Sequence, residues 1–210
     1  MSELSKRFLT SLFLLFLIIL SFININILCI LVLIVNFLVI DEFVKIFSRV
    51  YKRNIFKKFL TILLVFIYMT YFSLVIYLFL IPSFSSNKLI LLFLLIICAS
   101  TDIGGFFFGR LIGGMKITKI SPNKTYSGFL GSIILSLFLG HIYFEFMSDT
   151  IKLNINLFYF IIIISLISQI GDLVISYFKR LAKIKDTGSI LPGHGGILDR
   201  IDSYIFTPSV

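Results

Sequence analysis

The chain has 210 residues, of which 59% are hydrophobic and only 14% are charged, and its mean hydropathy is +1.08. Soluble domains usually carry about 25% charged residues, so this composition excludes an ordinary soluble globular protein. The net charge of +9 sits in short segments between apolar blocks. It does not form a basic patch interleaved with aromatic residues, which argues against nucleic-acid binding.

Long apolar segments predict an all-α polytopic membrane protein with about six transmembrane helices. About 20 residues are needed to cross a ~30 Å hydrocarbon layer. The candidate spans are residues 8–23, 25–41, 59–81, 89–109, 126–147 and 157–176. The first two are joined by Asn24-Ile25-Asn26, which predicts a tight hairpin. We divide the chain into an N-terminal membrane region, 1–88, and a second region, 89–210, in which we expect the active site.

Basic residues are distributed unequally between the loops. All but Lys88 and Lys152 fall at the chain ends or in the loops after the second, fourth and sixth spans. The positive-inside rule then predicts that both termini are cytoplasmic. A short chain without a targeting extension suits a bacterial inner membrane. A signal peptide at the first span is disfavoured because no small-residue cleavage site follows it.

The last span carries a polar stripe. At helical spacing, one face holds Ser165, Ser168, Gln169, Asp172, Ser176, Lys179 and Lys183. One charged side chain near mid-bilayer costs about 2.5–3.5 kcal/mol, so we expect this face to line a hydrated cavity open to the cytoplasm. Asp172 and Lys179 are separated by about 10 Å along the axis, which disfavours a direct ion pair. Asp172 should bind a cation and Lys179 an anion.

A glycine-rich tail follows that span. Four glycines and a proline within residues 185–202 rule out a regular helix there, and successive backbone N–H groups can bind an anion. Asp199 and Asp202, together with Asp172, would supply the hard oxygen ligands that Mg²⁺ takes beside phosphate. This set predicts phosphoryl or nucleotidyl transfer on a lipid.

The motif at 176–202 is similar to a known signature. Ser176-x-x-Lys179-Arg180-x4-Lys185-Asp186-x7-His194-Gly195-Gly196-x-x-Asp199-Arg200-x-Asp202 resembles that of the phosphatidate cytidylyltransferases, or CDP-diacylglycerol synthases. Two upstream segments also resemble this family: Thr101-Asp102-x-Gly104-Gly105-x3-Gly109-Arg110 and Ser121-Pro122-x-Lys124-Thr125-x-x-Gly128. The resemblance covers about residues 95 to 202, and the chain is shorter than typical members. It implies transfer of CMP from CTP to phosphatidate in phospholipid biosynthesis, with release of pyrophosphate.

The resemblance also implies roles for individual residues. Asp172 and Asp199 would bind Mg²⁺ or another hard divalent cation, with Asp202 as a further carboxylate. Lys179 would contact phosphate charge and Ser176 would orient a ligand. The remaining substrate-binding candidates are Arg180, Lys124, Asp102, Lys185, His194, Gly195, Gly196 and Arg200. For Asp102 the alternative is a pair with Arg110, and His194 is either an acid–base group or a hydrogen-bond donor. Gly105-x3-Gly109 predicts close helix packing.

Two other functions remain as alternatives. A CTP-dependent lipid kinase would use similar contacts but transfer the γ-phosphoryl group. A membrane transporter of anions would show polar residues continuing to the outer leaflet and often an inverted repeat, and neither is evident here. The expected partners are CTP, phosphatidate and the lipid bilayer, with a homodimer left open.

Overall fold

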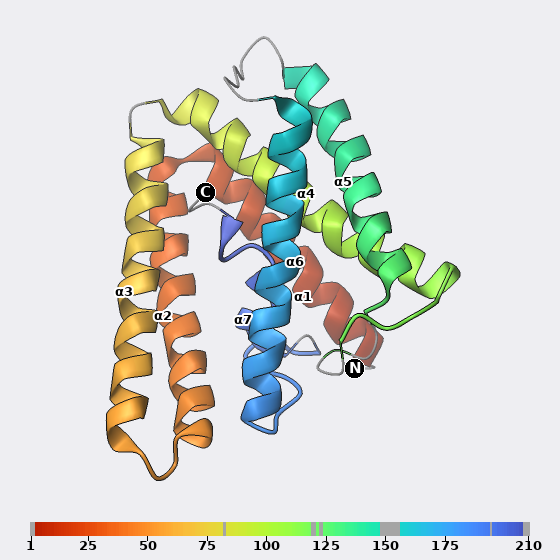
Figure 1. Cartoon of the computed structure of the whole chain (residues 1–210). Coiled ribbons are helices and arrows are strands. Elements are labelled where there is room, and N and C mark those ends of the chain that lie inside the picture. The colour runs from red at the N-terminus through yellow and green to blue at the C-terminus, as the bar shows by residue number, and fades with distance from the viewer. Residues whose placement is uncertain are drawn as a thin grey trace. The chain divides into compact units, whose positions relative to one another are not determined.

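The computed structural model describes residues 3–81, 83–118, 121, 124–147, 156–193 and 195–207. Within this part of the chain the regular structure is helical, with isolated β-bridges and no β-strand. The helices, shown in Figure 1, are α1 (Glu3–Ile23), α2 (Ile25–Val50), α3 (Ile55–Leu80), α4 (Phe84–Leu111), α5 (Tyr126–Met147), α6 (Leu157–Leu181) and α7 (Leu198–Ile201). The all-α prediction is confirmed.

Five of these helices, α2 to α6, are long and apolar enough to cross a membrane. The apolar part of α1, Arg7–Ile23, is shorter than the other five. The structure thus supports an integral membrane protein in which five of the six predicted segments meet the requirements for a span. Helix α2 continues to Val50, past the predicted end of its span at residue 41. Hydropathy detects the apolar part of a helix and does not detect a polar continuation of the same helix.

The chain forms two compact units. The first contains Met1–Pro82 and Phe178–Ile201, and the second contains Ser83–Tyr177 and Asp202–Val210. Residues 178–201, which carry most of the glycine-rich tail, therefore group with the N-terminal helices despite their distance along the chain.

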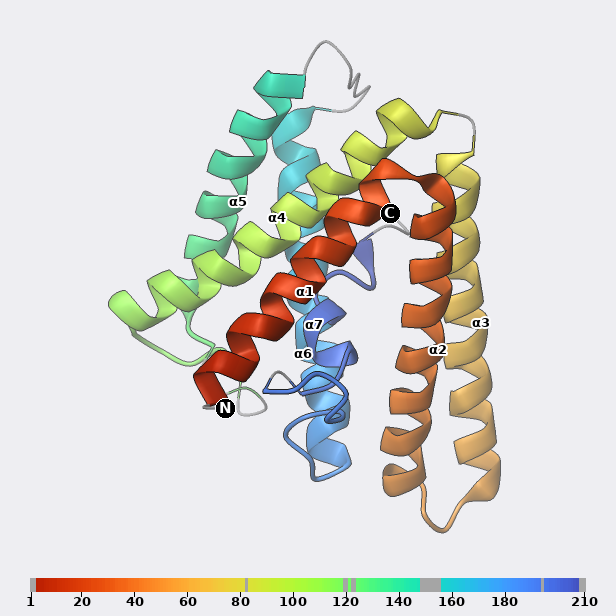
Figure 2. The same ribbon diagram turned by 180° about the vertical axis from the view of Figure 1, so that it is seen from behind.

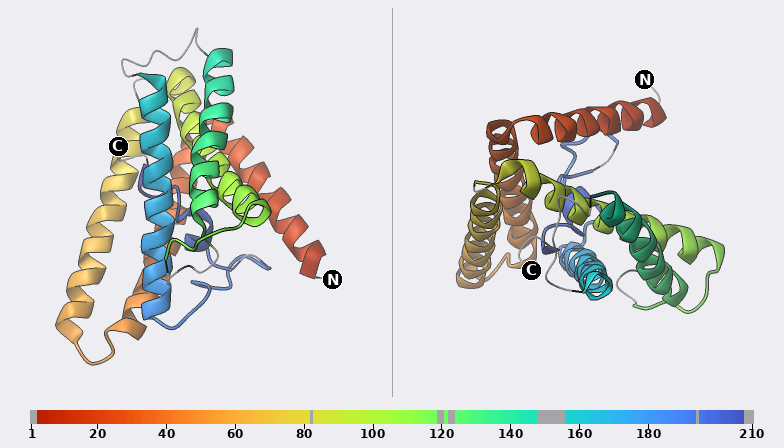
Figure 3. Two further views of the ribbon diagram at one scale, coloured as in Figure 1. Left: turned by 45° about the vertical axis from the view of Figure 1, so that its right-hand side comes forward. Right: turned by 90° about the horizontal axis from the view of Figure 1, so that it is seen from above.

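In the first unit, α2 and α3 lie side by side as an antiparallel pair (Figures 1 and 2). A buried hydrogen bond joins them: the Asn36 side-chain amide donates to the Met69 carbonyl at 3.1 Å and also to the Ser73 hydroxyl. Helix α1 is steeply inclined to this pair (Figure 3). The chain reverses between α1 and α2 at Asn24, whose side chain accepts from Asn26 N at 2.9 Å and caps α2. The predicted tight turn is confirmed, but α1 leaves it at a steep angle to α2 and does not run alongside that helix.

In the second unit, glycines bring α4 and α5 into close contact. A Cβ added at Gly104 would lie 2.7 Å from the Gly131 carbonyl, and one added at Gly128 would lie 2.7 Å from the Gly105 carbonyl. Both distances are too short for any side chain. The packing role predicted for the glycines of α4 is confirmed. Helix α6 joins the same unit, where the buried ring of Phe93 stacks on Phe160 at 6.0 Å.

Candidate active site

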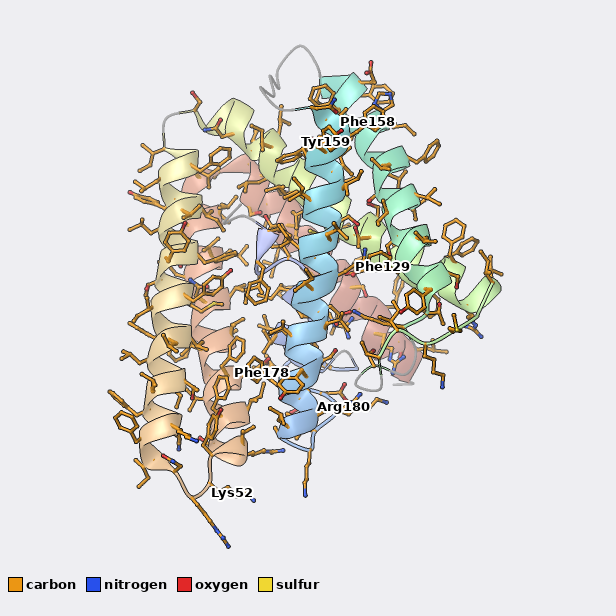
Figure 4. All side chains as sticks on the ribbon, viewed as in Figure 1. Lys52, Phe129, Phe158, Tyr159, Phe178 and Arg180 are labelled. Atoms are coloured by element: carbon orange, nitrogen blue, oxygen red, sulfur yellow. The ribbon has the colours of Figure 1, made fainter. Side chains whose placement is uncertain are left out.

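The tail of the first unit is organised around Asp199, at the start of α7. Its Oδ1 lies 2.8 Å from the ammonium of Lys179, and the two side chains are only 5% and 12% exposed. Its Oδ2 accepts hydrogen bonds from Thr187 N at 2.8 Å, from the Thr187 hydroxyl at 3.1 Å and from Gly196 N at 3.0 Å. Asp199 thus holds together the end of α6 and both sides of the glycine-rich loop. In Figure 4 this end of α6 is marked by the labelled residues Phe178 and Arg180, which flank Lys179 in the sequence.

Asp199 is held in its ionised form. Burial alone raises the pKa of its carboxyl group, but the hydrogen bonds from Lys179 and from the backbone of Thr187 and Gly196, with the Lys179 charge, outweigh burial. The net result is a pKa below the usual value. An anionic carboxylate is the form required both for this ion pair and for binding a cation.

A second carboxylate, Glu42 of α2, supports the same loop. It is completely buried. Its Oε2 accepts from the Thr187 hydroxyl at 2.5 Å and from Leu198 N at 2.9 Å, and its Oε1 accepts from Ile197 N at 2.9 Å. A Cβ added at Gly196 would lie 2.0 Å from the Thr187 hydroxyl and 2.5 Å from Glu42 Oε2, so only glycine fits there.

Sequence reasoning missed Glu42. The sequence shows only an acidic residue just after an apolar segment. The same pattern is expected for a solvent-exposed residue at the end of a membrane helix. Its role depends on a partner 145 residues away, which no local pattern reveals.

Beside this loop lies a polar cavity of about 710 Å³. It is lined by Arg7, Lys185, Asp186, Gly188, Ser189, Leu191, Pro192, Gly193, Gly195 and Arg200. Gly193 and Gly195 have positive φ angles of 78° and 87°, a region that favours glycine. Three predicted substrate-binding residues, Lys185, Gly195 and Arg200, are thus brought together. Arg180 is exposed and its guanidinium donates to the Ile184 carbonyl at 3.3 Å, and His194 lies outside the described residues.

The second unit contains another ion pair, between Lys124 and Asp172. Lys124 Nζ lies 2.5 Å from Asp172 Oδ2, with both side chains about a quarter exposed, at 26% and 27%. The Ser176 hydroxyl donates to Asp172 Oδ1 at 3.3 Å. The prediction that Asp172 and Lys179 do not pair with each other is confirmed, because each has another partner.

Asp102 and the last residues of the chain lie in this second cluster. Asp102 Oδ2 accepts from the Ser203 hydroxyl at 2.8 Å, and the carboxylate interacts electrostatically with Asp172 and Lys124. Arg110 instead lies over the Phe106 ring at 5.9 Å. Asp102 thus lies in the same cluster as Lys124 and Asp172.

Asp202 follows α7 and belongs to the second unit. Its Oδ1 accepts from Ser203 N at 3.0 Å. Its carbonyl oxygen would be 2.8 Å from a Cβ at Gly171, so the tail backbone lies directly against α6, next to Asp172. A glycine is required at residue 171 for this approach.

The polar stripe of α6 has two parts. Ser165 and Ser168 are completely buried, and Ser165 accepts from the Thr101 hydroxyl of α4 at 3.0 Å. The expectation that the whole stripe lines a hydrated cavity is therefore wrong at its deep end, where both hydroxyls are buried and that of Ser165 bonds to α4. Asp172 and Ser176 are partly exposed and remain available to a ligand.

The described residues contain no group of three or more His, Cys, Asp or Glu side chains placed to hold a metal ion. Lysine ammonium groups lie next to both Asp172 and Asp199 instead. Mg²⁺ usually takes only one or two carboxylates and completes its shell with water and substrate phosphates. Individual carboxylates of this kind therefore still suit such an ion.

Comparison with known proteins identifies several relatives. The chain is 48% identical over 117 residues to a phosphatidate cytidylyltransferase of Staphylococcus saprophyticus, a match that covers 55% of this chain and 45% of that protein. It is 46% identical over 108 residues to the enzyme of that name from Bacillus subtilis, covering 51% and 40%. For Helicobacter pylori the values are 44% over 119 residues, covering 55% and 43%. The matched part thus spans less than half the length of these relatives.

A wider match comes from the family as a whole. The sequence model described as the cytidylyltransferase family matches residues 4–210. This range includes both clusters and the N-terminal helices, for which the sequence alone indicated only a hydrophobic pattern. The resemblance inferred from the motif is confirmed, and the chain belongs to the cytidylyltransferase family.

Proposed function

We propose that this protein transfers CMP from CTP to phosphatidate, giving CDP-diacylglycerol and pyrophosphate in membrane phospholipid biosynthesis. The observation that carries the proposal is the arrangement around Asp199, which fixes an ionised carboxylate and Lys179 beside a loop with a basic cavity. Family membership and relatives named phosphatidate cytidylyltransferase support the same chemistry.

The reaction needs no covalent intermediate on the protein. An oxygen of the lipid phosphate attacks the α-phosphorus of CTP in line, and a new P–O bond forms as the bond from the α-phosphorus to the bridging oxygen of pyrophosphate breaks. The lipid phosphate is already an anion, so no base is required. The protein has to position two polyanions and offset their charge. In this proposal Lys179 and Arg180 contact phosphate charge, and Ser176 orients a ligand.

Asp172 and Asp199, with Asp202 as a further carboxylate, are proposed to bind Mg²⁺ or another hard divalent cation. The donors fit such an ion because carboxylate oxygens are the ligands it prefers. The bound ion would offset the charge that develops on the transferred and leaving phosphates. The neighbouring Lys124 and Lys179 would then be available to substrate phosphate. Lys185, Arg200, Gly195, Gly196, Asp102 and His194 complete the proposed substrate contacts.

The decisive experiment supplies phosphatidate and CTP labelled on either the α- or the γ-phosphate to the purified protein. We expect the α label in the lipid product, whereas γ label in lipid would identify the rival lipid kinase. Asp199→Asn should lose at least about 100-fold in rate. The control is Asp41→Asn, whose exposed carboxylate pairs with Lys45 on the same helix. A folded parent that labels no lipid would refute the proposal.

We further propose that the protein resides in a bacterial inner membrane with both termini in the cytoplasm. The contact between Arg7 of α1 and Gly193 of the tail supports placing these two basic segments on one side. Labelling of cysteines introduced at Lys52 and Lys88 in intact cells tests this orientation. Only the cysteine at Lys88 should react with a reagent that does not cross the membrane.

A further inference from the structure

The basic cavity beside the tail draws residues from three separate segments. Arg7 comes from α1, Lys185 from the loop after α6, and Arg200 from α7. Asp186 is the single acidic side chain among the described residues that line it. Three cations against one carboxylate leave an excess of positive charge, and the lining also includes loop backbone at Gly188, Gly193 and Gly195.

Arg7 is held against the loop. A Cβ added at Gly193 would lie 2.8 Å from Arg7 Cγ and 3.5 Å from Arg7 N. One turn further along α1, the Thr10 hydroxyl donates to the Pro192 carbonyl at 3.4 Å. The first turns of α1 therefore pack directly on the loop segment 192–193. Sequence reasoning assigned Arg7 only to membrane orientation, a role that requires no contact with any other segment.

Cations gathered around one cavity repel one another, and an anionic ligand relieves that repulsion. Phosphate groups fit this lining best because guanidinium groups bind phosphate oxygens through paired hydrogen bonds. A volume of about 710 Å³ also lies within the range of small-molecule sites, roughly 300–1,000 Å³.

We propose that Arg7 is a phosphate-binding residue, so that α1 contributes to the substrate site rather than serving only as a membrane anchor. This inference rests on the proposed function, because it assumes that the phosphate belongs to a substrate or product of that reaction. Two sources share this chemistry: the polyphosphate of the nucleotide and the headgroup of phosphatidate.

The experiment compares Arg7→Gln, Arg7→Lys and the matched control Arg53→Gln, whose exposed side chain lies in the turn between α2 and α3. Binding of pyrophosphate and of short-chain phosphatidate to the detergent-solubilised protein is measured by calorimetry. The Michaelis constants for CTP and for phosphatidate are measured alongside. Arg7→Gln should weaken binding of one ligand about tenfold, as expected for one charge-assisted hydrogen bond. Arg7→Lys should show a smaller loss, and Arg53→Gln should match the parent.

The affected ligand identifies the source. A change confined to pyrophosphate and CTP assigns Arg7 to the nucleotide, and a change confined to phosphatidate assigns it to the lipid. Thr10→Ala tests the alternative that α1 merely supports the loop, because it weakens the helix–loop contact and leaves the charge in place. Equal losses in Thr10→Ala and Arg7→Gln, or unchanged affinity for both ligands in Arg7→Gln, would overturn the inference. Because binding is read without turnover, this result is separate from whether the parent makes CDP-diacylglycerol.

Discussion

The carboxylate of Glu42 and the hydroxyl of Thr187 lie 2.5 Å apart, although 145 residues separate them in the chain. The same carboxylate accepts the N–H groups of Ile197 and Leu198. A single side chain of α2 therefore holds both sides of the loop that presents Asp199. This relationship makes the geometry of the tail depend on a helix that carries none of the recognisable motif.

Replacing Glu42 should destabilise the protein. Glu42→Ala leaves the N–H groups of Ile197 and Leu198 without their acceptor, and each buried unsatisfied group costs about 1–3 kcal/mol. The Thr187 hydroxyl would keep only its bond to Asp199. We expect a loss of about 3 kcal/mol in the free energy of unfolding, measured by thermal or denaturant unfolding in detergent. Glu42→Gln should also destabilise, since its amide NH₂ would face backbone donors. The neighbouring Asp41→Asn is the control, and equal effects at the two positions would contradict the assigned role.

The ion pairs should differ in strength according to their burial. The side chains of Lys179 and Asp199 are 12% and 5% exposed, whereas those of Lys45 and Asp41 are 57% and 43% exposed. Because solvent screens its charges, an exposed ion pair contributes only about 0–1 kcal/mol to stability. Breaking a buried pair costs about 3–5 kcal/mol. Double-mutant cycles on unfolding should therefore give a larger coupling energy for Lys179–Asp199. Added salt should reduce only the Lys45–Asp41 coupling, and the reverse order would refute this reading.

Low pH should destabilise the folded protein by protonating Asp199, which holds the glycine-rich tail together. The pKa of this carboxyl group is lowered in the folded protein, so its contribution is fully present above the ordinary value near 3.8. It is lost as the pH falls from there through the lowered pKa. Unfolding measured from pH 6 down to about pH 2 should show the parent losing stability relative to Asp199→Asn only below about pH 3.8. A constant difference between the two proteins would show that folding does not lower the pKa of Asp199.

The glycines of α4 should respond to alanine in a graded way. A Cβ at Gly104 would meet backbone, 2.7 Å from the Gly131 carbonyl, whereas at Gly105 the nearest atom is the Ser132 hydroxyl at 2.9 Å. A hydroxyl can rotate away and a backbone carbonyl of a packed helix cannot. Gly104→Ala should therefore cost at least about 2 kcal/mol, and Gly105→Ala clearly less. Thermal unfolding in detergent measures both, and equal losses would argue against this packing.

Much of the fold could be predicted because membrane spans depend on local composition. The apolar segments place α2 to α6 correctly, and the glycine pattern of α4 predicts a close helix contact, which the structure makes with α5. Hydropathy does not register that a helix continues after its apolar part ends, so the last turns of α2, including Glu42, lay outside the predicted span.

The site could be predicted only in part. The motif names Lys179, Asp199, Lys185 and Arg200, which the first unit brings together, but not their partners. Lys124 pairing with Asp172 and Glu42 accepting from Thr187 are contacts between segments distant in sequence. A polar stripe likewise does not reveal which hydroxyls pack between helices, as Ser165 does, and which stay accessible, as Ser176 does.

The buried Glu42 also limits how this protein can be divided or recombined. A fragment that begins after α3 would retain every recognisable motif residue yet leave Thr187, Ile197 and Leu198 without their common acceptor. Grafting the terminal segment onto another membrane scaffold should succeed only when α2 is transplanted with it. A chimera between relatives should therefore keep Glu42 and Thr187 together. The boundaries of the motif do not mark where the gene can be divided.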